Sequence, residues 1–238
     1  MCLSAASAAT VAEISTVSED GNTLIYTDAA GKRIGFLDIS DPANFTEATA
    51  SRVARWEIDG SDTSVGHILQ QPLIAKARNG RWMVFSGNGL NSSAGVAQLL
   101  AIDAETGAVS RISTLTGTAA SPNGLLGLTA ISTAGDGVVD IIYAGDQQGR
   151  LWKFDLSASD PLGWKVAYGS AAVPQPLFSA ASGQAITARP DVTPHPAGGY
   201  LVSFGTGSYL SRSDLGTTTT QSLYGIRDSG TTVSANEL

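Results

Sequence analysis

The sequence predicts an all-β protein, a β-propeller of about four four-stranded blades that forms an arc of a larger ring. A hairpin pattern that recurs four times along the chain is the main observation behind this prediction. The composition agrees with it, because 27 of the 238 residues are Gly and Gly supplies the positive φ that tight hairpin turns require. No apolar pattern with the 3.6-residue period of a helix is evident, which excludes stacked helical repeats.

Each copy of the hairpin pattern has an apolar strand, a polar turn or insertion that contains Gly, and a second strand that ends in Asp. The first copy, at residues 25–40, reads like the third, at residues 142–157. The other two copies lie at residues 82–103 and 200–228 and contain longer insertions. A β-sandwich would give no reason for four copies of one motif, so we interpret the repeats as propeller blades.

Apolar runs on either side of each hairpin define the blades. Such runs precede each copy and usually follow it, which gives each unit about four short strands. The last unit lacks a sequence for its outer strand. The chain is therefore predicted to be one propeller domain or a partial propeller over residues 1–238, with blades at 11–65, 66–119, 120–182 and 183–238.

The charge of the chain excludes several classes of partner. With 21 acidic and 14 basic residues the formal net charge is −7, so we expect no nucleic-acid partner, because phosphate binding needs clustered Lys and Arg. No run of about 18 apolar residues occurs, so we expect no membrane insertion. Cys2 is the single cysteine, which excludes an internal disulfide and a Cys-based zinc site.

Several segments, in the right order, resemble the C-terminal β-propeller of the PilY family of type IV pilus tip adhesins and biogenesis factors. They read GHILQQPLIA at 66–75, NGRW at 79–82, FSGNGLN at 85–91, SPNG at 121–124, YAGDQQGRLWKFD at 143–155 and FGTGSY at 204–209. Together they cover most of the chain. Long segments in a shared order are more specific than any single short motif.

The resemblance implies a non-catalytic domain that acts in type IV pilus biogenesis, control of pilus retraction and surface adhesion. Its implied partners are minor pilins or other pilus tip components, together with a host or abiotic surface receptor that the sequence does not identify. The implied location is the bacterial cell surface, at the pilus tip or at the outer membrane and periplasm. Residues 1–6 lack the basic and apolar regions of a signal peptide, so we expect this chain to be a fragment of a longer exported protein.

Two other functions compete with this interpretation. Residues 102–107 (IDAETG) resemble the Asp-Ala-x-Thr-Gly part of the quinoprotein blade repeat, but Arg111 stands where that repeat carries Trp. A quinoprotein-type dehydrogenase is therefore one alternative, and a periplasmic propeller scaffold for outer-membrane assembly is the other. We identify no catalytic and no organic-cofactor residues, because the sequence shows no Ser/His/Asp order, paired-His motif or phosphate-binding Gly loop.

The PilY resemblance also implies a calcium loop of the form Asp-x-Asp/Asn-x-Asp-Gly-x-x-Asp, which residues 132–140 match in part. Asp136 and Asp140 would supply carboxylates and Val138 a backbone carbonyl, whereas Ser132 is a weak ligand and Ala134 is none. Calcium requires six to eight oxygen ligands, so this is a degenerate candidate site. The alternative is that the Asp-Gly pair at 136–137 simply forms a hairpin turn. The sequence leaves both interpretations open.

For several polar turn residues and for the tryptophans, the sequence predicts structural roles. Residues 146–148 (DQQ) are predicted to form a solvated turn of the third blade. Asn88 is predicted to belong to a Gly/Asn/Ser turn without a binding role. The tryptophans are predicted to pack between blades, namely Trp56, Trp82, Trp152 and Trp164.

Overall fold

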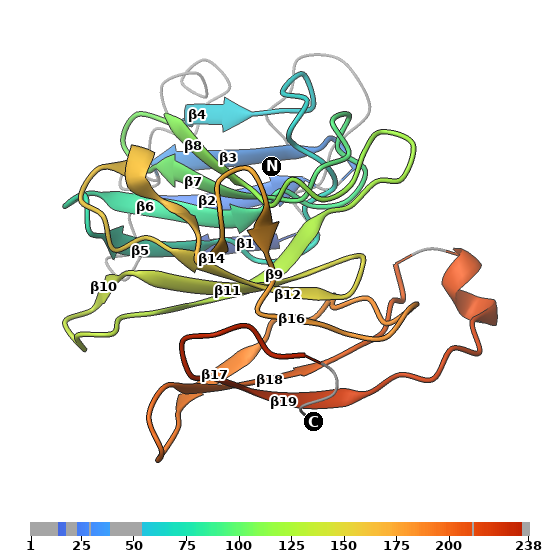
Figure 1. The fold of residues 1–238 in the computed structure, drawn as a ribbon. Coiled ribbons are helices and arrows are strands. Elements are labelled where there is room, and N and C mark those ends of the chain that lie inside the picture. Colours follow the sequence, from blue (N-terminus) through green and yellow to red (C-terminus); the bar gives the residue numbers. More distant parts are fainter. Residues whose placement is uncertain (1–13, 18–22, 29, 39–53, 211, 235–238) are drawn as a thin grey trace.

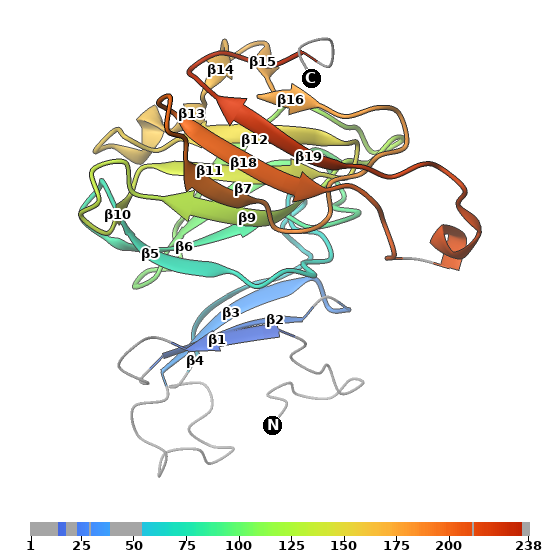
Figure 2. The same cartoon turned by 90° about the horizontal axis from the view of Figure 1, so that it is seen from below.

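The computed structural model describes residues 14–17, 23–28, 30–38, 54–210 and 212–234. Within these residues the chain forms β-strands and two 3₁₀ helices, η2 (Pro161–Gly163) and η3 (Arg212–Gly216). The strands form four larger sheets that follow one another in chain order and stack face to face (Figures 1 and 2). The all-β prediction is confirmed.

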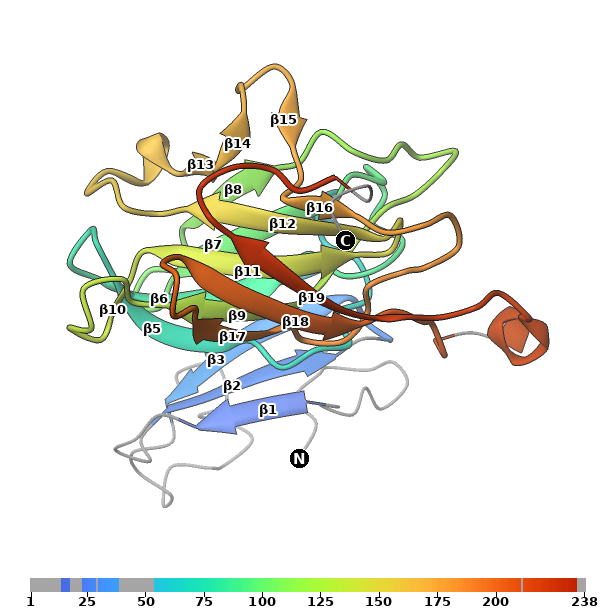
Figure 3. The ribbon, with the colours of Figure 1, turned by 60° about the horizontal axis from the view of Figure 1, so that its bottom comes forward.

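The first two sheets are antiparallel meanders. The first contains β1 (Ile14–Val17), β2 (Thr23–Asp28), β3 (Arg33–Asp38) and β4 (Ala54–Ile58). The second contains β5 (Leu73–Ala77), β6 (Trp82–Gly87), β7 (Gln98–Asp103) and β8 (Val109–Ser113). It gains a fifth strand, β10 (Val138–Val139), which pairs parallel with β5 (Figure 3). The sequence did not predict this strand from a distant part of the chain.

The third and fourth sheets are also antiparallel. The third contains β9 (Leu125–Ile131), β11 (Ile141–Asp146), β12 (Arg150–Asp155) and β13 (Lys165–Val166), with β16 (Phe178–Ser179) also paired to β12. A small hairpin joins β14 (Tyr168–Gly169) to β15 (Pro174–Gln175). The fourth sheet has three described strands, β17 (Asp191–Pro194), β18 (Tyr200–Gly205) and β19 (Leu223–Asp228), as expected for a unit without a sequence for its outer strand.

The four predicted hairpins are the second and third strands of the four sheets, β2–β3, β6–β7, β11–β12 and β18–β19. The Asp that ends the third strand has a structural role in each of the three copies whose side chain is described. Asp103 Oδ1 accepts the N–H groups of the two residues at 105–106, Asp155 Oδ1 accepts that of Ser157, and Asp228 Oδ1 accepts that of Gly230. Each Asp thereby stabilises the turn that follows its strand.

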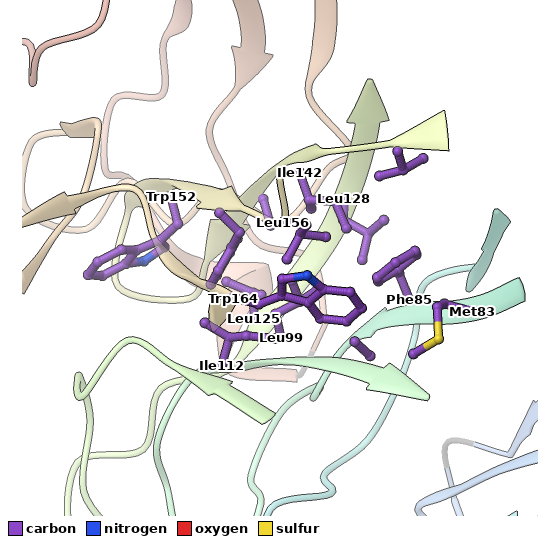
Figure 4. Packing of buried hydrophobic residues seen from close by; sticks show 14 of the residues in the cluster. Met83, Phe85, Leu99, Ile112, Leu125, Leu128, Ile142, Trp152, Leu156 and Trp164 are labelled. Atoms are coloured by element: carbon purple, nitrogen blue, oxygen red, sulfur yellow. The ribbon is translucent and has the colours of Figure 1, made fainter. Parts of the chain in front are cut away.

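Three apolar clusters lie between successive sheets. The cluster between the first and second sheets includes Ile25, Ile34, Val84 and Ile102. The cluster between the second and third includes Phe85, Leu99, Trp152 and Trp164 (Figure 4). The cluster between the third and fourth includes Tyr143, Phe178, Val202 and Phe204. Each inner sheet is therefore buried on both faces, which is why its central strands β6, β7 and β11 are buried along nearly their whole length.

The alternation of side chains along β6 shows how one strand serves two clusters. Met83 and Phe85 contact the cluster shared with the third sheet, whereas Val84 contacts the cluster shared with the first. This is the two-residue period of a strand. Trp164, from the segment before β13, lies 6.3 Å from Phe85 between ring centroids. The face-to-face packing of successive sheets thus depends on large side chains from both of them.

Candidate functional site

The predicted calcium loop connects two strands of the third sheet. It begins after β9, ends where β11 begins, and contains β10 within it. Gly135 (φ 69°) and Gly137 (φ 76°) adopt the left-handed conformation, which Gly adopts without strain. The parallel pairing of β10 with β5 places this loop against the second sheet, with Val138 opposite Lys76 and Val139 opposite Ala77.

The two acidic side chains of the loop bind the guanidinium group of Arg78. Arg78 directly follows β5 in the second sheet. Its Nη1 lies 2.7 Å from Oδ2 of Asp136, and its Nη2 lies 2.8 Å from Oδ2 of Asp140. Asp140 is buried and Asp136 is exposed. The structure therefore brings the two predicted carboxylate ligands together, with an arginine side chain bound to both.

The remaining oxygen atoms of these carboxylates accept hydrogen bonds from the loop itself. Oδ1 of Asp136 accepts from Oγ of Ser132 at 2.8 Å and from the N–H of Val138 at 3.0 Å. Asp140 accepts from the N–H and the hydroxyl of Thr133, at 3.0 and 2.7 Å. Ser132 and Val138, the other predicted ligands, thus act as donors to Asp136.

These contacts also determine the charge state of Asp136. The hydrogen bond from Ser132, the N–H of Val138 and the Arg78 guanidinium together lower the pKa of Asp136 to about 2. The carboxylate is therefore ionised at neutral pH, and its charge is matched by Arg78.

This donor set does not fit a calcium ion. Calcium takes six to eight oxygen ligands at about 2.3–2.6 Å, whereas all four carboxylate oxygens of Asp136 and Asp140 already accept hydrogen bonds. A guanidinium between the carboxylates also repels a second cation. Over the part of the chain that the structure describes, no group of three or more His, Cys, Asp and Glu side chains could hold a metal ion.

Comparison with known proteins identifies the family. The family model described as the PilY1 beta-propeller domain matches residues 29–237. The chain belongs to the PilY1 β-propeller family. The four sheets are therefore propeller blades, and both the propeller prediction and the PilY resemblance are confirmed.

Two relatives in the PilY1 family are much longer than this chain. The type IV pilus biogenesis factor PilY1 of Pseudomonas aeruginosa PAO1 is 39% identical over 223 residues, which are 85% of this chain and 19% of that protein. A PilY1 homolog of Xylella fastidiosa is 36% identical over 224 residues, 88% of this chain and 15% of that protein. The chain thus spans less than a fifth of these two relatives.

A solved structure gives the same result for the fold. The crystal structure of the Pseudomonas aeruginosa PilY1 C-terminal domain superposes with a TM-score of 0.77 at 36% identity. The match covers 89% of this chain and 48% of that domain. The blades of this PilY1-family propeller therefore follow the arrangement of about half of the solved domain.

Asp146 contradicts the prediction of a solvated turn in the third blade. Its side chain is fully buried, and its carboxylate accepts hydrogen bonds from Nδ2 of Asn123 and Nε1 of Trp152, both at 2.8 Å. It also accepts the backbone N–H groups of Gln148 and Arg150. Burial raises the pKa of Asp146, against the effect of these hydrogen bonds. The turn prediction was wrong here because the carboxylate points into the interior.

Asn88 has the same type of role between the second and third blades of this PilY1-family chain. Its Nδ2 donates to the carbonyl oxygens of Ser64 and Val96. Its Oδ1 accepts the N–H groups of Gln98 and of Leu125, the first residue of β9. Asn88 follows β6 directly and Asp146 ends β11, so a polar residue at the end of the second strand is the repeat signal that could have identified both.

Asp228 is the centre of a polar cluster that the sequence did not indicate. It is buried in β19 and accepts hydrogen bonds from the hydroxyls of Tyr143 at 2.5 Å and Tyr168 at 2.6 Å. Lys153 Nζ lies 2.6 Å from its Oδ2 and over both tyrosine rings, 5.9 and 5.5 Å from their centroids. The cluster joins the third blade to the fourth.

Trp82 borders a cavity of about 990 Å³ that is lined by residues of the first three blades and by Arg189. The indole is 60% exposed, so the prediction that it packs between blades is wrong. It is the first residue of β6, opposite the exposed Lys76, at an end of the sheet that neighbouring blades do not cover. The cavity lining also includes Phe36, Leu128 and Arg189, a mixture that favours no single class of ligand.

The described helices bear on the expectation that the chain does not insert into a membrane. Among the residues that the structure describes, no helix has the length and apolar character needed to cross a bilayer.

Proposed function

We propose that this propeller is a non-catalytic interaction domain that acts in type IV pilus biogenesis at the bacterial cell surface. The observation that carries the proposal is the similarity over 85% of the chain to a protein named type IV pilus biogenesis factor PilY1. Because the chain spans only 19% of that relative, the role, the partners and the location are proposed for the domain. Control of retraction and adhesion to surfaces are the finer parts of the proposal.

The buried polar side chains form structural hydrogen bonds, and this supports a non-catalytic role. Asn88, Asp146 and Asp228 are nearly inaccessible to solvent, and their hydrogen bonds link strands and blades. A catalytic group must reach a substrate in a suitable pose, and these three side chains are directed into the protein. They instead give a rigid scaffold on which surface loops are held, as is common for binding proteins.

Minor pilins or other pilus tip components are the proposed partners. The test is surface plasmon resonance with the purified chain immobilised and individual purified minor pilins in solution. We expect saturable binding of at least one of them, and purified components of the outer-membrane assembly machinery serve as the comparison. Binding only to the assembly components would replace the pilus role with that of a periplasmic scaffold.

The enzymatic alternative has its own test. The purified chain is incubated with a quinone cofactor, calcium and a panel of primary alcohols, and dye-linked oxidation is measured. We expect no turnover above a sample without the chain. Quinone-dependent oxidation would show that the domain is a dehydrogenase, in disagreement with the non-catalytic role.

A further inference from the structure

We propose that the guanidinium group of Arg78 takes the place of a metal ion in the loop at 132–140. The loop is thereby held against the second blade without calcium. In contrast to a metal site, this arrangement needs nothing from the solvent, so the junction between the second and third blades keeps its structure at any calcium concentration.

The contacts of the guanidinium match those required of a central cation. It donates from Nη1 and Nη2 to Asp136, at 2.7 and 3.4 Å, and from Nη2 to Asp140 at 2.8 Å. Arginine presents several N–H groups in a fixed plane and remains charged at all relevant pH values. Charge-assisted hydrogen bonds of this type are stronger than neutral ones. One side chain therefore bridges both carboxylates of the loop.

The backbone around Arg78 holds it in this position. The N–H of Gly80 donates to the carbonyl of Ala77 at 2.9 Å, so Arg78 occupies the second position of a tight turn. The N–H of Ala77 donates in turn to the carbonyl of Arg81 at 2.9 Å. Because β10 pairs with the strand that leads into this turn, the distance from Arg78 to the loop is set by strand pairing.

The residues of the loop suit an arginine better than a calcium ion. Ser132 and Ala134 stand where the calcium-loop pattern carries acidic or amide side chains. With fewer carboxylates the loop cannot supply the six to eight oxygen ligands of calcium, and a monovalent guanidinium better matches the smaller negative charge. Ser132 is used instead to hold Asp136 by a hydrogen bond of 2.8 Å.

The burial of Asp140 and Arg78 indicates that the position of the loop depends on their ion pair. The side chain of Asp140 is 6% exposed and that of Arg78 is 26% exposed. Without Arg78, Asp140 would keep its hydrogen bonds to Thr133 but would lose its only described ion pair. A buried carboxylate without a counter-charge is strongly unfavourable, so the loop would then require another cation or would separate from the second blade.

Calcium titration of the purified 238-residue chain by calorimetry is the first test, and it is independent of any pilus assay. We expect no saturable heat. Saturable heat that disappears in the variant with Asp136→Ala and Asp140→Ala would overturn the proposal.

Thermal unfolding in EDTA is the second test, with Arg78→Gln compared with Arg227→Gln. Arg227 is exposed on β19 and donates to the backbone carbonyls of Ala197 and Gly198, so its loss leaves no buried carboxylate without a described partner. We expect Arg78→Gln to lower the Tm by about 2–4 °C and Arg227→Gln to lower it less. Equal shifts would show that Arg78 has no special role in the loop.

Restoring the missing ligands gives a third test, which measures calcium affinity rather than thermal stability. The change Ser132→Asp with Ala134→Asp is made once with Arg78 retained and once with Arg78→Ala. We expect calcium to bind at least about ten-fold more weakly when Arg78 is retained. Equal calcium affinity in the two variants would show that the guanidinium does not occupy the position of the ion.

Discussion

Lys153 on β12 and Asp228 on β19 form an ion pair of 2.6 Å across the junction of the third and fourth blades. The side chain of Asp228 is 1% exposed and that of Lys153 is 15% exposed. The carboxylate also accepts hydrogen bonds from two tyrosine hydroxyls and from the N–H of Gly230. Its described side-chain partners all come from the third blade, so the position of the fourth blade depends on this contact.

Replacing Asp228 is therefore expected to destabilise the chain strongly. Asp228→Asn should lower the free energy of unfolding by about 3–5 kcal/mol, because it leaves Lys153 buried without a counter-charge. Urea unfolding followed by tryptophan fluorescence measures this change in the free energy of unfolding. Asp155→Asn is the matched control, since Asp155 ends the third strand of its own blade and its described side-chain hydrogen bonds go to Ser157. A loss no larger than that of the control would contradict the role of Asp228.

The same cluster predicts how stability depends on acid. Burial alone would raise the pKa of Asp228, but hydrogen bonds from Lys153, Tyr143 and Tyr168 outweigh it and hold the pKa below its ordinary value. The stabilisation is thus complete above the unfolded pKa of about 3.9 and is lost as pH falls through the lower folded value. Stability of the native chain and of Asp228→Asn, measured by urea unfolding between pH 7 and pH 2, should converge at the acid end. A constant difference would contradict this pKa.

At alkaline pH, ionisation of Tyr143 and Tyr168 limits the stability that the cluster provides. Burial and the hydrogen bond to Asp228 raise the pKa of Tyr143 and of Tyr168. Their contribution is therefore complete below the unfolded pKa of about 10 and is lost above it as pH approaches the higher folded values. Tyrosinate absorbance during an alkaline titration should show these two side chains ionising well above the pKa of a free tyrosine. Ionisation together with exposed tyrosines would contradict the buried hydrogen bonds.

Two tryptophans form a matched pair for testing the core. Trp164 is buried between the second and third blades, whereas Trp82 is 60% exposed. Trp164→Ala should lower the free energy of unfolding by about 3–5 kcal/mol, and Trp82→Ala should cost about 1 kcal/mol or less. Chemical unfolding of the two variants measures both losses in the free energy of unfolding. Similar losses would mean that Trp82 is packed in solution.

Two glycines test how closely the blades approach. A Cβ on Gly124 would lie 2.1 Å from the carbonyl oxygen of Gly89, whereas a Cβ on Gly205 would meet nothing within 4 Å. Gly124→Ala must displace backbone of the second blade and should cost more than about 2 kcal/mol. Gly205→Ala should leave stability unchanged or raise it by up to about 1 kcal/mol. Differential scanning calorimetry compares the two, and an unaffected Gly124→Ala would contradict the close approach.

The sequence could predict the blades because their signals are local. A strand, a Gly turn and a strand that ends in Asp lie within a short stretch, and each Asp whose side chain is described caps the turn that follows it. Repetition of this unit then favours one architecture over others. The short final blade followed from the same reasoning.

Contacts between distant segments could not be predicted in this way. The parallel pairing of β10 with β5 joins residues about sixty positions apart and leaves no pattern in either segment. Arg78 therefore carried no signal, because its turn gives no indication of what the side chain binds. Trp82 and Trp164 are chemically identical, and only their positions, at the exposed end of strand β6 and between two blades, decide which is buried.

The amount of pilin on the cell surface tests the proposed role of this domain in pilus biogenesis. In the bacterium that encodes the chain, the gene is replaced by a version without the codons for residues 54–234, and by the unaltered gene as control. Pili sheared from the cells are quantified by immunoblot, also in a background whose pili cannot retract. We predict a large loss of surface pilin, and recovery in the non-retracting background if the propeller controls retraction. Surface pilin equal to that of the control in both backgrounds would contradict a role in pilus biogenesis.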